Sequence, residues 1–209
     1  ALPTTEEVSG ARRGTRNAFP QTAIRELIVN ALIHQDLTVT GAGPMVEIFS
    51  NRIEFTNPGT PLVRIERIVN DPPQSRNEKL SALMRRLGYC EEAGSGWDTI
   101  VEGCEDYLLP APRIDASSGT STRVTLFGHK EFKSMTQDER LDACYWHACV
   151  RYGRGEFVSN ASLRERFGLK ASNSAQISRL IREALDKPLI KPLDPSTSPR
   201  YMVYMPYWA

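Results

Sequence analysis

The clearest helical pattern in the chain lies over residues 22–36, where apolar residues recur at three- and four-residue spacing. This spacing predicts an amphipathic helix that begins near Thr22. Its predicted buried stripe consists of Ile24, Leu27, Ile28, Ala31 and Leu32.

Polar residues also recur along this helix. Glu26 and Asn30 are four residues apart, so they stack on consecutive turns, and His34 follows four residues later. From the spacing alone, two interpretations are open. In the first, Glu26 and Asn30 are simply exposed to solvent beside the apolar stripe of the helix. In the second, they form a hydrolytic site in which Glu26 activates a water and Asn30 binds Mg²⁺.

Alternating apolar and polar residues over 45–49 and 52–56, joined by a turn at Ser50-Asn51, predict an antiparallel hairpin. The strong turn signal Asn57-Pro58-Gly59 follows it. We expect helices over 77–87 and 97–107 and a strand over 120–127, with irregular chain before residue 21 and over 108–118. The helix over 77–87 has an apolar stripe of its own, formed by Leu80, Leu83, Met84 and Leu87.

Glycines mark the start of the helix at 97. Gly94-Ser95-Gly96 precedes it, and backbone N–H groups at a glycine-rich helix N-terminus can cradle an anion such as a phosphate. Many such segments are only tight turns, so this motif by itself is a weak indication of phosphate binding.

A second domain is predicted to begin after Lys133. Thr136 and Glu139 form a capping-box pattern that begins a new helix. Helices over 160–167 and 173–186 and strands over 189–193 and 201–204 follow. Three helices followed by a hairpin is the order of a winged helix-turn-helix, which we assign to residues 134–209.

The third of these helices has a polar face opposite its apolar stripe. Amides and guanidiniums suit base edges and phosphates, and a helix of this length fits the major groove of DNA. The chain up to Lys133 has a net charge of −2 and the remainder +3, which favours an anionic partner for the C-terminal part. A small helical domain for protein contacts or dimerisation stays open as the alternative. The predicted DNA-contacting residues are Lys170, Asn173, Gln176, Arg179, Arg182 and Arg200.

Composition excludes several classes of protein. The 209 residues are 40% hydrophobic and 24% charged, as in water-soluble globular proteins of one or two domains. No apolar run approaches a membrane span, and no signal peptide opens the chain, so we expect a cytoplasmic protein without membrane contact. The absence of an initial Met suggests a piece of a longer protein. Sparse cysteines indicate reduced thiols, and we expect Cys144, His147 and Cys149 to pack in the core rather than bind zinc.

Four segments taken together resemble a known family. Arg25–Asp36, Arg52–Gly59, Glu92–Gly96 and Thr122–Phe127 are similar to the GHKL (Bergerat-fold) ATP-binding domain, in particular its divergent "RecG-like C-terminal" branch. That branch commonly follows a Schlafen/AlbA-type domain in bacterial transcriptional regulators and often precedes a winged helix. The resemblance covers about residues 20–128. It implies an α+β fold in which residues 1–133 form an α/β sandwich, with a mixed, mainly antiparallel sheet and helices on one face.

The resemblance also implies roles for individual residues. Glu26 would polarise the attacking water, and Asn30 would hold Mg²⁺. Asn57 departs from the family, in which an Asp reads the adenine amino group; an amide accepts a hydrogen bond without the charge of a carboxylate. The implied nucleotide-contacting residues are Asn30, His34, Asn57, Gly59, Gly94, Ser95, Gly96 and Thr122.

We therefore expect an ATP- and DNA-binding transcriptional regulator with slow Mg²⁺-dependent ATP hydrolysis at most. The sequence contains no G-x-x-x-x-G-K-[ST] phosphate loop, which excludes a P-loop helicase motor. The alternative is a nucleotide-free scaffold or dimerisation domain whose winged helix contacts DNA or protein. A homodimer is compatible with either.

Overall fold

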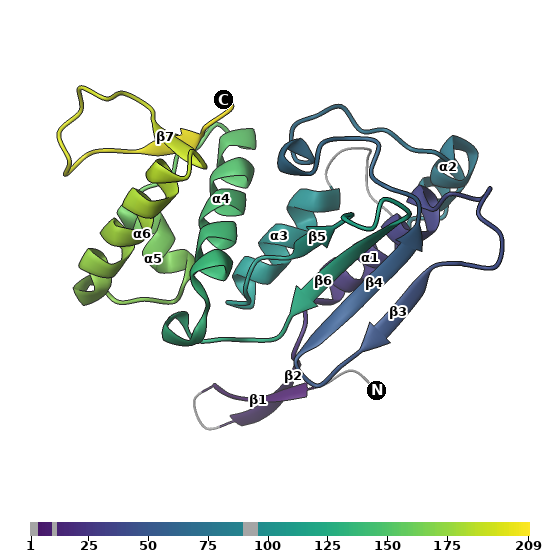
Figure 1. The fold of residues 1–209 in the computed structure, drawn as a ribbon. Coiled ribbons are helices and arrows are strands. Elements are labelled where there is room, and N and C mark those ends of the chain that lie inside the picture. Colours follow the sequence, from purple (N-terminus) through teal and green to yellow (C-terminus); the bar gives the residue numbers. More distant parts are fainter. Residues whose placement is uncertain (1–3, 10–11, 90–95) are drawn as a thin grey trace. The chain divides into compact units, whose positions relative to one another are not determined.

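The computed structural model describes residues 4–9, 12–89 and 96–209. The chain forms two compact units, one up to His129 and one from Lys130 onward (Figure 1). The sequence places the boundary after Lys133. Each unit is described by itself below.

The first unit opens with a hairpin of β1 (Thr4–Ser9) and β2 (Arg12–Asn17), paired antiparallel. The prediction of irregular chain here was wrong. The two strands are rich in polar residues and lack the apolar alternation that marks a half-buried strand, so periodicity did not predict them.

In the part of the chain that the structure describes, the sheet of the first unit consists of β3 (Met45–Ile48), β4 (Arg52–Pro58), β5 (Arg113–Asp115) and β6 (Ser121–Phe127). Their order is β3-β4-β6-β5, and the pairings are antiparallel. The predicted α+β class is confirmed. β5 forms within a stretch predicted to be irregular, where Ile114 is paired with Val124.

Within the described residues, this sheet is accompanied by the helices α1 (Gln21–His34), α2 (Glu78–Arg86) and α3 (Gly96–Asp106). A 3₁₀ turn, Ile65–Arg67, lies in the long loop after β4. α1 packs against both β4 and α3 (Figure 1). Burial of large apolar side chains, each contributing roughly 1.5–3 kcal/mol, holds the layers together. The largest include Phe19, Leu27, Ile53, Phe55, Ile100 and Leu126.

The buried face of α1 differs from the predicted stripe. Ile28 is 40% exposed, whereas Glu26 is only 2% exposed, so the interpretation of Glu26 as a solvated edge was wrong. Because α1 is covered by the sheet and also by α3, it buries a broader face than a single stripe. The helix begins at Gln21, with Pro20 rather than Thr22 at the N-cap. Its buried residues are Ala23, Glu26, Leu27, Val29, Ala31 and Ile33.

The apolar stripe of α2 is only partly covered. Leu83 is 49% exposed and Leu87 is 59% exposed, while the buried residue of this helix is Ser81. The predicted helix itself is present. An amphipathic pattern favours a helix, but the neighbouring elements decide how much of its apolar face is buried.

The second unit contains α4 (Gln137–Gly153), α5 (Asn160–Arg166) and α6 (Ser174–Asp186). Short 3₁₀ turns lie at Phe132–Ser134 and Ala171–Asn173. An antiparallel pair, β7 (Ile190–Pro192) and β8 (Tyr204–Pro206), closes the chain. The predicted capping box of Thr136 and Glu139 is present at the start of α4. The final strand begins at Tyr204, where the predicted one ended.

The core of the second unit contains the sulfur atoms of α4. Cys144 and Cys149 are fully buried and His147 is 5% exposed. Burial, with a smaller effect from Cys149, raises the pKa of the Cys144 thiol to about 12, so the thiol stays protonated. Within the described ranges no group of three or more His, Cys, Asp or Glu side chains could hold a metal ion. The burial of these three side chains places them in the core, as expected.

Among the described residues, no helix combines the length and apolar character that crossing a membrane requires.

Candidate functional site

A pocket of about 170 Å³ opens in the first unit between α1, the sheet and the loop that follows β4. Phe55, Val124 and Ile114 line it from three neighbouring strands, because they lie opposite one another in register and so share a face. Leu27 and Ala31 of α1 complete an apolar wall. Such a cavity, mostly apolar with a few polar groups, is the usual form of a small-molecule site.

The pocket brings together predicted site residues that are far apart in the sequence. They come from α1, the end of β4, the first turn of α3 and the start of β6. Gly94 and Ser95 lie outside the described residues. The predicted residues that line the pocket are Asn30, His34, Asn57, Gly96 and Thr122.

Glu26 lies beside this pocket, against the first residue of α3. A Cβ on Gly96 would lie 3.1 Å from Glu26 Oε2 and 3.9 Å from Asn30 Oδ1. The two side chains from consecutive turns of α1 therefore meet at the N-terminus of α3. Because Gly96 has no side chain, the carboxylate and the amide can approach the backbone closely.

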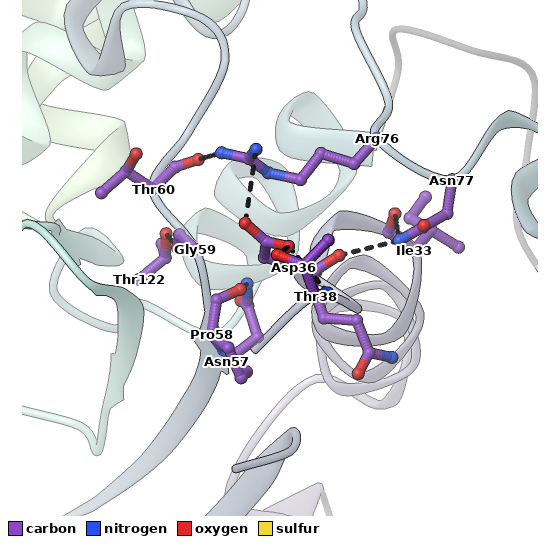
Figure 2. Close-up of polar contacts among 11 residues, drawn as sticks. Ile33, Asp36, Thr38, Asn57, Pro58, Gly59, Thr60, Arg76, Asn77 and Thr122 are labelled. Atoms are coloured by element: carbon purple, nitrogen blue, oxygen red, sulfur yellow. Dashed lines mark hydrogen bonds and ion pairs between the residues drawn. The ribbon is translucent and has the colours of Figure 1, made fainter. Parts of the chain in front are cut away.

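Asn57 is 7% exposed, and its amide is oriented by the carbonyl of the next residue. Asn57 Nδ2 donates to the Pro58 carbonyl at 3.1 Å (Figure 2). Since the reversed amide would set two oxygen atoms against each other, this bond assigns the nitrogen. Asn57 Oδ1 remains as the hydrogen-bond acceptor of the side chain.

Gly59 contributes through its backbone. It has a φ of +93°, and a Cβ there would lie 3.0 Å from Asp36 Cβ, so a larger residue would be strained. Thr122 Oγ1 donates to the Gly59 carbonyl at 2.7 Å. The turn after β4 is thus held between β6 and the chain that leaves α1.

Arg76 lines the pocket and its neighbour Asn77 holds the end of α1; the predicted site included neither residue. Asn77 Nδ2 donates to the carbonyls of Ile33 at 3.0 Å and Gln35 at 2.8 Å. It therefore satisfies carbonyls at the C-terminal end of α1. An Asn directly before a helix usually indicates an N-cap, but no side-chain cap bond forms at α2. The residue type therefore predicts a cap for α2, whereas the Asn77 side chain bonds to the end of α1.

The guanidinium of Arg76 lines the pocket. Arg76 Nη2 donates to the Thr60 carbonyl at 2.7 Å, and Nη1 lies 3.9 Å from Asp36 Oδ2 (Figure 2). The Asp36 N–H in turn donates to the Pro58 carbonyl at 2.9 Å. These contacts join the end of α1, the turn after β4 and the segment before α2.

The charged and titratable side chains at the end of α1 differ in their protonation. Burial, and then the positive charge of Arg76, lower the pKa of His34 from its ordinary 6.5, so its imidazole is neutral at pH 7. Hydrogen bonds from the Thr38 side chain and backbone, and more weakly the charge of Arg76, lower the pKa of Asp36. Arg76 and the neutral imidazole of His34 therefore line the pocket, and the ionised Asp36 lies behind Arg76, with Oδ2 3.9 Å from Arg76 Nη1.

The DNA-contacting residues predicted in the second unit lie mainly at its surface. Gln176, Arg179 and Arg182 are exposed on α6, and Asn173 is half-buried. Lys170 and Arg200 are also exposed. α6 has this polar face because its apolar residues point into the unit: Ile177, Leu180, Ile181 and Ala184 are buried.

Comparison with known families supports part of the resemblance seen in the sequence. Residues 41–126 match the family described as "Putative ATP-dependent DNA helicase recG C-terminal". The matched segment, which runs from just before β3 into β6, is therefore ATPase-like. It contains Asn57, Arg76, Gly96 and Thr122, and it begins after α1.

Among solved structures, the chain is similar to the DIP2311 protein from Corynebacterium diphtheriae, with 18% sequence identity and a TM-score of 0.58. The similarity covers 97% of this chain and 42% of that one, so the chain spans less than half the length of its structural relative. At this identity the likeness concerns the fold alone. No curated protein sequence matches the chain.

Proposed function

We propose that the first unit binds ATP together with Mg²⁺ and that the second unit is a winged helix that binds duplex DNA, as in a transcriptional regulator. The observation that carries the nucleotide proposal is the convergence of Asn30, Asn57, Gly96 and Thr122 on one apolar pocket. The ATPase-like match over residues 41–126 supports it.

In this proposal the base enters the apolar part of the pocket. Phe55, Val124 and Ile114 would contact its faces. Asn57 Oδ1 would accept a hydrogen bond from an exocyclic amino group, as the carboxylate of the family does. The bond between Asn57 Nδ2 and the Pro58 carbonyl presets this acceptor, although without a carboxylate's charge.

The residues near Gly96 suit a magnesium ion. Glu26 Oε2 lies 3.1 Å, Asn30 Nδ2 3.7 Å and Asn30 Oδ1 3.9 Å from the position that a Cβ on Gly96 would take, so a carboxylate and an amide are close together. Mg²⁺ takes oxygen ligands while keeping several waters and substrate phosphates. Asn30 would supply the amide ligand. The ion would neutralise phosphate charge. Glu26 would accept a proton from the attacking water, and hydrolysis would be slow.

For the second unit, the proposal rests on the exposed face of α6. Its amide and two guanidiniums project from a helix whose opposite side is buried, and a helix of this kind fits the major groove. Lys170 before α6 and Arg200 between β7 and β8 would contact phosphates.

The test of nucleotide binding is calorimetric titration of the whole chain with Mg-ATP, with Mg-GTP as the control. We expect saturable binding that favours ATP. Absence of heat with either nucleotide at millimolar concentration would refute the proposal for the first unit.

A second candidate is a nucleotide-free scaffold, and the replacement of the family's Asp by Asn57 favours it. The variant Asn30→Ala separates the two functions. It should weaken Mg-ATP binding if the pocket is a nucleotide site, whereas a scaffold has no such binding to weaken.

A further inference from the structure

We infer that Arg76 binds a phosphate group of the ligand and makes the pocket selective for nucleotides over nucleosides. This inference deepens the proposed nucleotide binding and rests on it. Arg76 comes from the segment before α2, outside the positions that the sequence motifs indicated.

Charge is the first reason. Among the described residues that line the pocket, Arg76 is the one whose side chain carries a positive charge at pH 7, because His34 is held neutral. The other ionised lining residue, Asp71, is occupied by Arg64 at 3.4 Å and Arg67 at 3.8 Å. Arg76 Nη1 itself lies 3.9 Å from Asp36 Oδ2, but Asp36 is not among the described residues that line the pocket. An anionic ligand entering this pocket would therefore find its cationic partner at Arg76.

The second reason is the unused hydrogen-bonding capacity of the guanidinium. A guanidinium has five N–H donors in a planar fork, and one of them bonds to the Thr60 carbonyl. Arg76 Nε is buried and has no hydrogen-bond partner within the described part of the chain. The 3.9 Å separation between Nη1 and Asp36 Oδ2 is too long for a hydrogen bond.

The third reason is that the guanidinium is held in place before any ligand arrives. Arg76 Nε would lie 3.4 Å from a Cβ at Gly59, so the side chain packs against the turn that follows Asn57. The Thr60 carbonyl fixes its far end. A fork positioned in this way loses little freedom on binding a phosphate through two parallel bonds, a geometry that lysine cannot reproduce.

The experiment measures the affinity of the whole chain for ATP and for adenosine, both with Mg²⁺, in the parent protein and in Arg76→Ala, Arg76→Lys and Arg86→Ala. Arg86 is the matched control because it is exposed in the last turn of α2 and is not among the described residues that line the pocket. We expect Arg76→Ala to weaken ATP binding by roughly 10- to 100-fold, as for a lost hydrogen bond to a charged group, while adenosine binding changes by less than about twofold. Arg76→Lys should recover part of the loss, and Arg86→Ala should resemble the parent.

Two outcomes would overturn the inference while leaving the proposed function intact. One is a parent protein that binds adenosine as tightly as ATP, a comparison that does not depend on any variant folding. The other is an Arg76→Ala variant whose affinities for ATP and adenosine fall by the same factor, which would mean that Arg76 only stabilises the structure through its bond to Thr60. A parent that binds neither ligand would remove the proposed function, and the inference with it.

Discussion

Gly96 lies directly against the carboxylate of Glu26, so that a Cβ on the glycine would come within 3.1 Å of Glu26 Oε2. The same Cβ would lie 3.7 Å from Asn30 Nδ2. The first residue of α3 and two consecutive turns of α1 therefore share one small space. A side chain at position 96 would have to move the carboxylate by a few tenths of an ångström.

This relationship predicts the effect of Gly96→Ala. Alanine favours a helix over glycine by roughly 0.5–1 kcal/mol, but here the methyl group displaces Glu26. We expect thermal stability close to that of the parent and a weaker affinity for Mg-ATP, by several-fold, measured by calorimetry. Gly43→Ala is the control, because a Cβ at Gly43 meets nothing within 4 Å. Equal affinities in the two variants would show that the approach of Gly96 to Glu26 is not needed for binding.

Replacing Glu26 tests its proposed role as general base. Glu26→Gln keeps the volume of this buried side chain but removes the group that accepts a proton. Loss of a positioned general base lowers rates by about 10²–10⁴-fold, so we expect ATP turnover to fall by that factor while Mg-ATP still binds. Phosphate release assays measure the turnover, with Glu47→Gln on β3 as the control. Turnover equal to that of the parent would exclude Glu26 as the base.

Restoring the family's carboxylate at position 57 should cost stability. In Asn57→Asp an oxygen would replace the amide nitrogen that donates to the Pro58 carbonyl at 3.1 Å. Two buried acceptors would then face each other, at a cost of about 1–3 kcal/mol in the free energy of unfolding. Part of the loss should be recovered as the pH falls, because protonation of the new carboxyl restores a donor. Urea unfolding at pH 7 and pH 5 measures both effects.

Asn51→Asp is the control for this variant, since Asn51 is exposed in the turn between β3 and β4. It adds the same charge without a buried clash. If both variants unfold at the same urea concentration, the bond to Pro58 does not stabilise the fold.

The environment of His34 predicts a pH dependence of stability. Burial and Arg76 lower the pKa of His34 below 6.5 in the folded state, so the unfolded chain takes up the proton first as the pH falls. The free energy of unfolding should therefore decrease below about pH 6.5, until the folded pKa is reached. We expect His34→Gln to reduce this slope in urea titrations between pH 5 and 8. A similar reduction in His129→Gln, which changes an exposed histidine, would contradict the assignment.

DNA binding by the second unit can be tested through Arg179. Arg179→Ala should lower the affinity for duplex DNA and reduce the dependence of log K on log salt by about one, if Arg179 contacts a phosphate. Fluorescence anisotropy over a salt series measures both quantities. Lys187→Ala is the control, because Lys187 lies just after α6 and is 3.5 Å from Asp138. An unchanged affinity in Arg179→Ala would favour a domain for protein contacts.

The sequence by itself determined the elements with strong local signals. The apolar spacing predicted the helix that carries Glu26 and Asn30, the alternation predicted the hairpin of β3 and β4, and the capping box predicted the start of α4. These signals act within a few residues, so local propensity and turn chemistry are enough to reveal them. Where local signals were weak, as in β1 and β2, prediction failed.

Tertiary structure decided which side chains are buried and which meet. The wider cover of α1 by the sheet and α3 buries Glu26 and leaves Ile28 exposed, a result that no single helical pattern contains. Asn57, Thr122 and Gly96 converge only because strand register and helix packing bring distant segments together. Arg76 belongs to the same pocket through an irregular loop without any periodic signal, since its position depends on contacts with Thr60 and Asp36 rather than on its neighbours in sequence.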